Sequence, residues 1–255
     1  MGQVLALLPA SGGVGATLLT AATAVRAAAA SRSVAAVDLD AWGAGLDVTF
    51  GLEQAPGWRW NALQEVSGVV DGAALAGRLP QAQGVRVLSM PRPWRPTGAS
   101  WQGAVADVLL GLRAAHELVV VDVPRDELTV SGLAGVADAV VVVVGTRVAQ
   151  LAAAAAVVPR LQSIGPETWV VLRGGDADLE ELVTDELDVP VLGRLRDDAR
   201  AAADVDDGVP AGTRGRGPVV DIADRILLRL LDRLAGAPPA AGVASREAAA
   251  PRRPA

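Results

Sequence analysis

A glycine-rich loop near the N-terminus, LALLPASGGVGAT over residues 5–17, is the stretch of this sequence best suited to chemistry. It places Gly12, Gly13 and Gly15 between an apolar run and a helix-prone run. Glycines let backbone N–H groups turn inward around an anion, and the first turn of a helix adds favourable partial positive charge. The order of strand, glycine loop and helix therefore predicts a phosphate-binding site.

The loop departs from the phosphate-binding motif Gly-x4-Gly-Lys-Ser/Thr at its first glycine and at its lysine. Ala10 occupies the first glycine position, Gly15 the second and Ala16 the lysine position, whereas Thr17 is retained. All 23 basic residues are arginine, so the chain contains no lysine. Neither this chain nor an identical second copy can therefore bring a lysine to a bound phosphate.

Acidic residues follow two of the apolar runs. Asp38 and Asp40 come after the run 33–37, and Asp122 ends the run Leu118–Val121. Ligands of parallel sheets collect beyond the carboxyl ends of the strands, where Asp122 would hold Mg²⁺ through its water shell, opposite the Thr17 hydroxyl. Taken alone, Asp122 fits equally well as a solvated acid that caps the next turn. Together with the glycine loop and the Asp38/Asp40 pair, it favours a nucleotide site.

These residues need a sheet to position them, and the apolar pattern predicts one. Continuously apolar segments alternate with helix-prone segments, which is typical of a mostly parallel α/β sheet with helices on both faces. We expect strands at 4–8, 33–38, 85–90, 117–123, 139–144, 168–172 and 189–195. We expect helices at 16–30, 71–79, 100–115, 126–136, 148–161, 179–187, 197–205 and 219–234.

Composition limits the class of protein. With 255 residues and 51% hydrophobic content, the chain can bury one α/β core, placed at residues 1–235, and the Ala/Pro/Arg-rich residues 236–255 predict a disordered tail. The absence of cysteine and the single His116 exclude cysteine and histidine metal sites. A net charge of −6 argues against a nucleic-acid-binding surface. Neither a signal peptide nor an apolar span of ~20 residues is present, so we expect a cytoplasmic protein.

Three motifs in this order resemble the MinD/ParA family of P-loop ATPases. SGGVGAT at 11–17 resembles its deviant Walker A loop, VDLDAWGAGLD at 37–47 the segment after its second strand, and VVVDVPR at 119–125 its Walker B strand. The likeness is greatest to the CpaE/TadZ-like branch, which includes actinobacterial septum-site-determining and helicase/secretion-neighbourhood proteins. It is supported by residues 45–63, 84–90 and 189–210 and covers about residues 1–235. The resemblance implies a P-loop NTPase sheet of the SIMIBI class.

The resemblance also implies ATP or ADP with Mg²⁺ as cofactor and a role for each motif residue. The phosphates would be wrapped by Gly12, Gly13, Val14, Gly15, Ala16, Thr17 and Leu18. Mg²⁺ would lie near Thr17, Asp38 and Asp122, and Asp40 would orient or activate the attacking water. Arg173 falls where family members place an adenine-contacting residue, and Leu195, Arg196, Asp197 and Asp198 would wall the base. Arg173 fits equally well as a surface loop arginine.

The departures from the family pattern affect the expected mechanism. Family members that hydrolyse ATP have lysines at the positions of Ser11 and Ala16. Loss of a charge directed at the developing phosphate charge costs several kcal/mol in the transition state, whereas binding through backbone N–H groups loses less. Arg125 or Arg147 could reach the phosphates, although Arg and Lys differ in shape and reach. We therefore expect weak or absent nucleotide binding and slow or absent hydrolysis.

The resemblance implies a homodimeric positioning protein that places a septum or a Tad/Flp pilus-secretion machine through protein partners. The amphipathic segment 219–234 is expected to pack on the sheet, and a peripheral membrane contact is the alternative.

Two other functions remain open. The loop also reads loosely as a Rossmann fingerprint of an NAD(P)-dependent oxidoreductase, with Asp38 on a ribose. Against this, Leu18 occupies the third glycine position, and the chain lacks the tyrosine and lysine of one large dehydrogenase class. A scaffold that binds no nucleotide is the third possibility.

Overall fold

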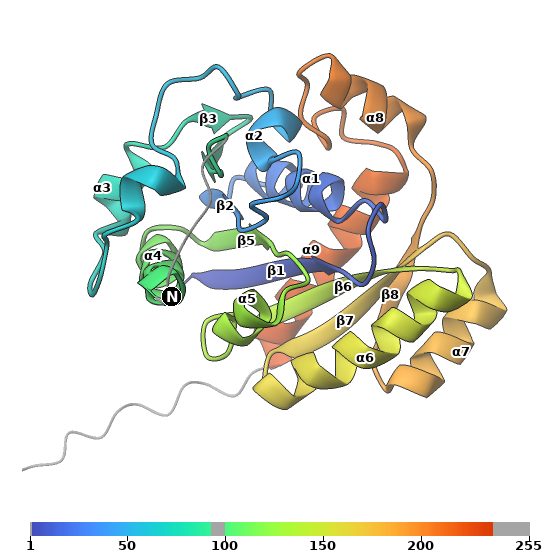
Figure 1. Ribbon diagram of the computed structural model, residues 1–255. Helices are drawn as coiled ribbons and strands as arrows, with labels where there is room; N and C mark the ends of the chain where they lie inside the picture. The colour runs from blue at the N-terminus through green and yellow to red at the C-terminus, as the bar shows by residue number, and fades with distance from the viewer. Residues whose placement is uncertain (1, 93–99, 237–255) are drawn as a thin grey trace, which may run out of the picture.

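The computed structural model describes residues 2–92 and 100–236, and it shows one sheet between two layers of helices (Figure 1). Its strands are β1 Gln3–Pro9, β2 Val34–Asp38, β3 Gln81–Ala82, β4 Val85–Leu88, β5 Leu118–Asp122, β6 Ala139–Gly145, β7 Glu167–Arg173 and β8 Val191–Leu195. Its helices are α1 Ala16–Ala29, α2 Leu46–Thr49, η1 Trp60–Leu63, α3 Gly72–Ala76, α4 Ser100–Ala115, α5 Glu127–Gly132, α6 Val148–Ile164, α7 Ala177–Leu187, α8 Ala199–Asp206 and α9 Pro218–Gly236. Residues 237–255 of the expected tail lie outside the described residues.

The eight strands form a single sheet in the order β3-β4-β2-β5-β1-β6-β7-β8. All neighbouring pairs are parallel except β3 and β4, which are antiparallel. The chain leaves the central strand β1 through α1 toward β2, and later crosses from β5 to β6 on the other side of β1. The loop after β1 therefore lies at a topological switch point, where sheets of this kind bind ligands.

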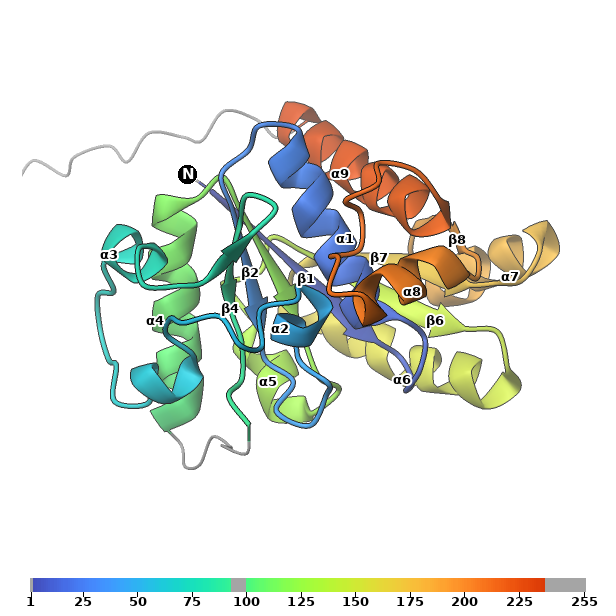
Figure 2. The same ribbon diagram turned by 90° about the horizontal axis from the view of Figure 1, so that it is seen from above.

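The two helical layers cover opposite faces of the sheet, as the view from above shows (Figure 2). Helices α1, α2, α8 and α9 pack on the face that receives Leu5 and Leu7 of β1. Helices α3 to α7 pack on the face that receives Ala6 and Leu8. Both faces of β1 are buried, which explains its continuously apolar sequence. The predicted fold class is confirmed.

Every predicted strand and helix is present, with ends shifted by at most a few residues. Three elements were not predicted, the four-residue helix α2, the two-residue strand β3 and the single 3-10 turn η1. All three are too short to display a period of two or of 3.6 residues in the sequence. Asp71 caps α3, because its carboxylate accepts hydrogen bonds from the N–H groups of Ala73 and Ala74.

Ion pairs fasten the edge of the sheet where the parallel strands begin, called the amino edge below. The Asp138 carboxylate accepts hydrogen bonds from the backbone N–H of Val4 at 2.8 Å and from Arg113 at 3.0 Å. Arg229 of α9 pairs with Glu167 of β7 at 3.0 Å. These contacts connect α4 and α9 to the first residues of the central strands.

Helix α9 packs on the sheet, as the sequence pattern favoured. Its apolar residues Val219, Ile222, Ile226 and Leu230 are buried in the same core cluster as the apolar residues of α1. The remaining face exposes Leu228, Leu231 and Leu234. No helix within residues 2–92 and 100–236 is long and apolar enough to cross a membrane.

Candidate functional site

The glycine loop joins β1 to α1 at the carboxyl edge of the sheet, where the parallel strands end. Gly13 and Gly15 adopt left-handed backbone conformations with φ of 74° and 87°, which strain residues that have a side chain. A Cβ atom added at Gly12 or Gly13 would meet no atom within 4 Å. The outer part of the loop is therefore open to a ligand.

The backbone N–H groups from Ser11 to Leu18 have no hydrogen-bond acceptor among the described residues. At either end of this run the donors are satisfied, because Ala10 donates to the Val143 carbonyl at 2.9 Å and Leu19 donates to the Gly15 carbonyl at 3.0 Å. The run includes the first turn of α1, whose N–H groups carry partial positive charge. Such a row of free donors at a helix N-terminus is suited to binding a phosphate.

Two buried carboxyl groups lie at the carboxyl edge beside the loop. Asp38 of β2 and Asp122 of β5 are directly paired across neighbouring strands, and both are almost completely buried. The Thr17 side chain lies close enough to Asp122 to lower the pKa of that carboxyl, and the Thr20 hydroxyl lies 3.5 Å from its Oδ1. The structure therefore brings together Thr17, Asp38 and Asp122, the three residues predicted to lie near Mg²⁺.

The pKa values of these two carboxyl groups are raised, mainly because burial disfavours the charged form. The charge of Asp122 raises the pKa of Asp38 further, and the charge of Asp40 raises the pKa of Asp122. Hydrogen bonds to Asp38 from the N–H groups of Asp40 and Leu46, each 2.9 Å long, lower its pKa only in part. A cation at this position would offset the repulsion between the carboxylates.

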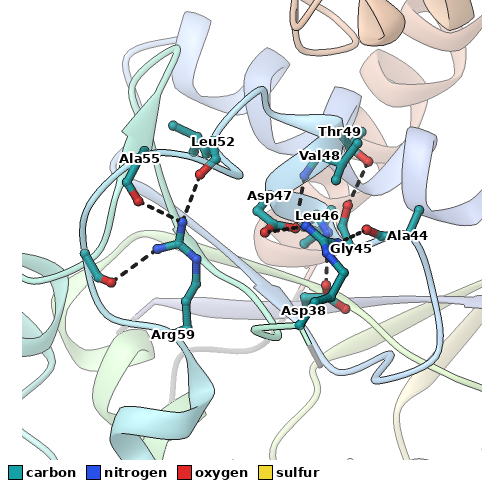
Figure 3. Close-up of polar contacts among 12 residues, drawn as sticks. Asp38, Ala44, Gly45, Leu46, Asp47, Val48, Thr49, Leu52, Ala55 and Arg59 are labelled. Atoms are coloured by element: carbon teal, nitrogen blue, oxygen red, sulfur yellow. Dashed lines mark hydrogen bonds and ion pairs between the residues drawn. The ribbon is translucent and has the colours of Figure 1, made fainter. Parts of the chain in front are cut away.

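Asp38 also anchors the loop that follows β2, as Figure 3 shows. Its carboxylate holds the N-terminus of α2 through Leu46, and Asp47 of the same helix pairs with Arg92 at 3.0 Å. Farther along, the Arg59 guanidinium donates to the Leu52 carbonyl at 2.9 Å (Figure 3). Charged side chains therefore hold the segment between β2 and η1: Asp38 before it, Arg59 after it, and Arg92 from a more distant part of the chain.

Asp40, the predicted water-activating residue, lies beside the buried pair but has local partners of its own. Its Oδ1 accepts hydrogen bonds from the N–H groups of Trp42 at 2.9 Å and Gly43 at 3.0 Å. Its charge nevertheless contributes to the raised pKa values of both Asp38 and Asp122. Asp40 is therefore near the predicted reaction centre, with one of its carboxylate oxygens engaged in a turn.

Two of the residues predicted to contact the base, Arg173 and Leu195, lie beside the glycine loop. A Cβ atom added at Gly15 would lie 3.8 Å from Nη1 of Arg173 and 3.9 Å from Cδ2 of Leu195. Arg173 pairs with Asp197 at 2.7 Å and donates to the Arg196 carbonyl at 3.4 Å. Arg173 is thus engaged with the segment after β8 beside the loop.

Two residues of the site were not predicted. Trp60 is completely buried, and its indole N–H donates to the backbone carbonyl of Asp38 at 2.6 Å. Thr20 lies one helical turn after Thr17 and faces the same carboxyl group, Asp122. The spacing of Thr17 and Thr20 on α1 was the only sequence signal for this second contact.

The donor set fits Mg²⁺ bound together with a phosphate ligand. Within residues 2–92 and 100–236, no group of three or more His, Cys, Asp or Glu side chains could hold a metal ion. Mg²⁺ commonly keeps several waters and takes only one or two carboxylates, with phosphate oxygens supplying the other ligands. Thr17 and the two aspartates would supply such a partial set beside the free N–H groups of the loop.

No protein-family model matches the chain. Two curated relatives from strains of Mycobacterium tuberculosis, Uncharacterized protein MT3760 and Uncharacterized protein Rv3660c, are each 36% identical over an alignment of 231 residues that covers 89% of this chain. The chain spans 63% of the length of these relatives.

Solved structures share the fold. The MinD cell division protein of Aquifex aeolicus has a TM-score of 0.70 and 19% identity, with 91% of this chain and 97% of that chain covered. A ParA family ATPase from Chlorobium tepidum has a TM-score of 0.73 and 16% identity, over 89% and 98% of the two chains. MinD of Pyrococcus horikoshii, solved with Mg-ADP, has a TM-score of 0.64 and 20% identity, over 92% and 98%. The chain therefore has the fold of the MinD and ParA P-loop ATPases.

Proposed function

We propose that this chain binds ATP or ADP with Mg²⁺ through the backbone of its glycine loop, and that it hydrolyses ATP slowly or not at all. The observation that carries this proposal is the run of free N–H groups from Ser11 to Leu18 beside Thr17, Asp38 and Asp122. The P. horikoshii protein of the same fold was solved with Mg-ADP, which supports this choice of ligand.

Each site residue then has a proposed role. The loop residues Gly12, Gly13, Val14, Gly15, Ala16, Thr17 and Leu18 would wrap the phosphates, and Thr17, Asp38 and Asp122 would hold Mg²⁺. Bound Mg²⁺ neutralises charge on the phosphate oxygens. Asp40 orients a water molecule, whereas Arg173, Leu195, Arg196 and Asp197 contact the base.

Slow hydrolysis follows from the side chains at two positions of the loop. Ala16 ends in a methyl group, and the Ser11 hydroxyl is buried without a hydrogen-bond partner. Neither supplies positive charge to the transferring phosphoryl group. The loss of one such stabilising group costs about 3 to 4 kcal/mol of transition-state stabilisation, or roughly a hundredfold to a thousandfold in rate.

The fold supports a positioning role carried out through protein partners. A MinC:MinD complex from A. aeolicus contains a chain of the same fold, with a TM-score of 0.71. By analogy we propose a homodimer that acts in septum placement or at a Tad/Flp-type pilus-secretion machine, as expected for a CpaE/TadZ-like protein. A peripheral membrane contact would use the exposed leucines of α9, Leu228, Leu231 and Leu234.

The proposed ligand is tested by isothermal titration of the chain with ATP, ADP and NAD, each with Mg²⁺. We expect binding of ATP and ADP, no binding of NAD, and weaker nucleotide binding when Mg²⁺ is chelated. Asp122→Asn should reduce the Mg²⁺ dependence without unfolding the chain, which circular dichroism checks. Binding of NAD alone would favour the oxidoreductase, and binding of none of the three would favour the scaffold.

A further inference from the structure

Two arginines flank the glycine loop at its opposite ends. Arg125, in the connection between β5 and α5, donates from Nη1 to the carbonyl of Ala10 at 3.4 Å. Arg173, the last residue of β7, places its Nη1 3.8 Å from the Cβ position of Gly15. The loop without lysine therefore has a guanidinium group at its start and another at its end.

The two guanidinium groups differ in how firmly they are held. Arg173 forms a 2.7 Å ion pair with Asp197 and also donates to a backbone carbonyl. Arg125 is exposed, and within the described part of the chain its only hydrogen bond is the long one to Ala10, with no carboxylate as an ion-pair partner. Arg125 therefore keeps most of its donors and its whole charge available to an anion.

The two arginines also approach different parts of the proposed nucleotide. Arg125 follows the carboxylate Asp122 by three residues, on the side where Thr17, Asp38 and Asp122 would hold Mg²⁺. Arg173 lies with Leu195 on the side proposed for the base. A cation at the Asp122 side would contact the terminal γ-phosphate of ATP, which ADP lacks.

We infer that Arg125 contacts the terminal phosphate of bound ATP and supplies, for binding but not for the transition state of hydrolysis, the positive charge that the lysine missing at position 16 would otherwise provide. This inference rests on the proposed nucleotide binding and makes Arg125 the residue that distinguishes ATP from ADP. A guanidinium can hold two phosphate oxygens at once, so a side chain that reaches in from a neighbouring strand end can take over this contact.

Arg147 is a matched control at the same edge of the sheet. It begins α6 in the connection after β6, its side chain is exposed, and its backbone N–H donates to Gln150 at 3.2 Å. No hydrogen bond or ion pair joins it to residues 10–18 within the described ranges. Arg147→Ala removes the same charge from the same edge without removing a loop contact.

The test measures the dissociation constants of ATP and ADP, each with Mg²⁺, for the wild-type chain and for Arg125→Ala, Arg125→Lys and Arg147→Ala. We expect Arg125→Ala to weaken ATP binding about tenfold or more, the usual effect of losing a hydrogen bond to a charged group, and ADP binding less than about threefold. Arg125→Lys should restore part of the ATP affinity, and Arg147→Ala should change neither constant. Unchanged ATP affinity in Arg125→Ala, or equal losses for ATP and ADP, would overturn the inference.

A second variant tests whether Arg125 stands in for the missing lysine. Ala16→Lys should raise the ATP affinity more in the Arg125→Ala background than in the wild-type background, because the two cations would serve the same phosphate. Equal gains in ATP affinity in both backgrounds would contradict the idea that Arg125 takes the place of the missing lysine. A wild-type chain that binds neither nucleotide would refute the proposed function itself. If the wild-type chain binds ATP and Arg125→Ala binds it equally well, only the inference about Arg125 is refuted.

Discussion

The buried pair Asp38 and Asp122 should make the protein less stable as the pH rises. Burial raises the pKa of Asp38 from 3.8 to about 8 and that of Asp122 to about 7. Between the ordinary and the raised values, the folded chain holds a proton that the unfolded chain has lost. Protonation therefore favours the folded state, and this stability is lost as the pH increases toward the folded-state pKa.

The size of the effect follows from proton linkage. His116 titrates in the opposite sense, because burial lowers its pKa below 6.5. Above pH 6.5 it is neutral in both the folded and the unfolded chain, so it adds little to the change of stability with pH. With one extra proton on the folded state, each pH unit costs about 1.4 kcal/mol of unfolding free energy. From about pH 6.5 to about pH 8 the loss is about 2 kcal/mol, which lowers the melting temperature of a chain of this size by about 4 to 8 °C.

The assay is thermal unfolding followed by circular dichroism across this pH range, without Mg²⁺ or nucleotide, for the wild-type chain and for Asp38→Asn. The asparagine cannot titrate, yet it retains an oxygen that can accept the N–H of Leu46 or Asp40. We expect the wild-type melting temperature to fall with pH and the variant to show a much smaller slope. A wild-type melting temperature that stays level or rises, or an equal slope in the variant, would refute the reasoning.

Three further substitutions test other parts of the structure. Gly15→Ala places a side chain at a φ of 87°, so it should cost about 1 kcal/mol in urea unfolding and also weaken ATP binding in titrations; unchanged values of both would show that the loop tolerates a side chain there. Ala16→Lys should raise ATP affinity about tenfold and speed phosphate release relative to the wild-type chain, and a rate no higher than that of the wild type would contradict the role given to the missing lysine. Asp138→Ala removes the acceptor of Val4 and the partner of Arg113, so it should lower the unfolding free energy by about 2 to 3 kcal/mol and leave the ATP affinity of the folded chain intact, with a loss of binding as the contrary result.

The layered fold could be predicted because its central strands are buried on both faces and are therefore apolar throughout. Strands β1 and β6 are covered on both faces, so their sequences are continuously apolar, and the glycine loop follows the first of them directly. The carboxyl ends of parallel strands share one edge, which is why Thr17, Asp38 and Asp122 could be expected to meet. That they hold a nucleotide remains a prediction.

The contacts that could not be predicted all depend on irregular segments and distant partners. The indole of Trp60 reaches the carbonyl of Asp38 from a loop without periodicity, and Arg125 reaches Ala10 across the sheet edge. Such contacts depend on the path of loops whose conformation the whole fold determines, and no local pattern in the sequence encodes it.

Variants at the two ends of the parallel strands should differ in how their phenotypes depend on temperature. Substitutions among the ion pairs of the amino edge, such as those at Asp138 or Glu167, deplete the folded population while each folded molecule keeps its binding site. Such alleles should be temperature-sensitive and recover at low growth temperature. Alleles at the open glycine loop should fail at every temperature, so growth at two temperatures would sort a random collection of variants by the end of the strands that each one affects.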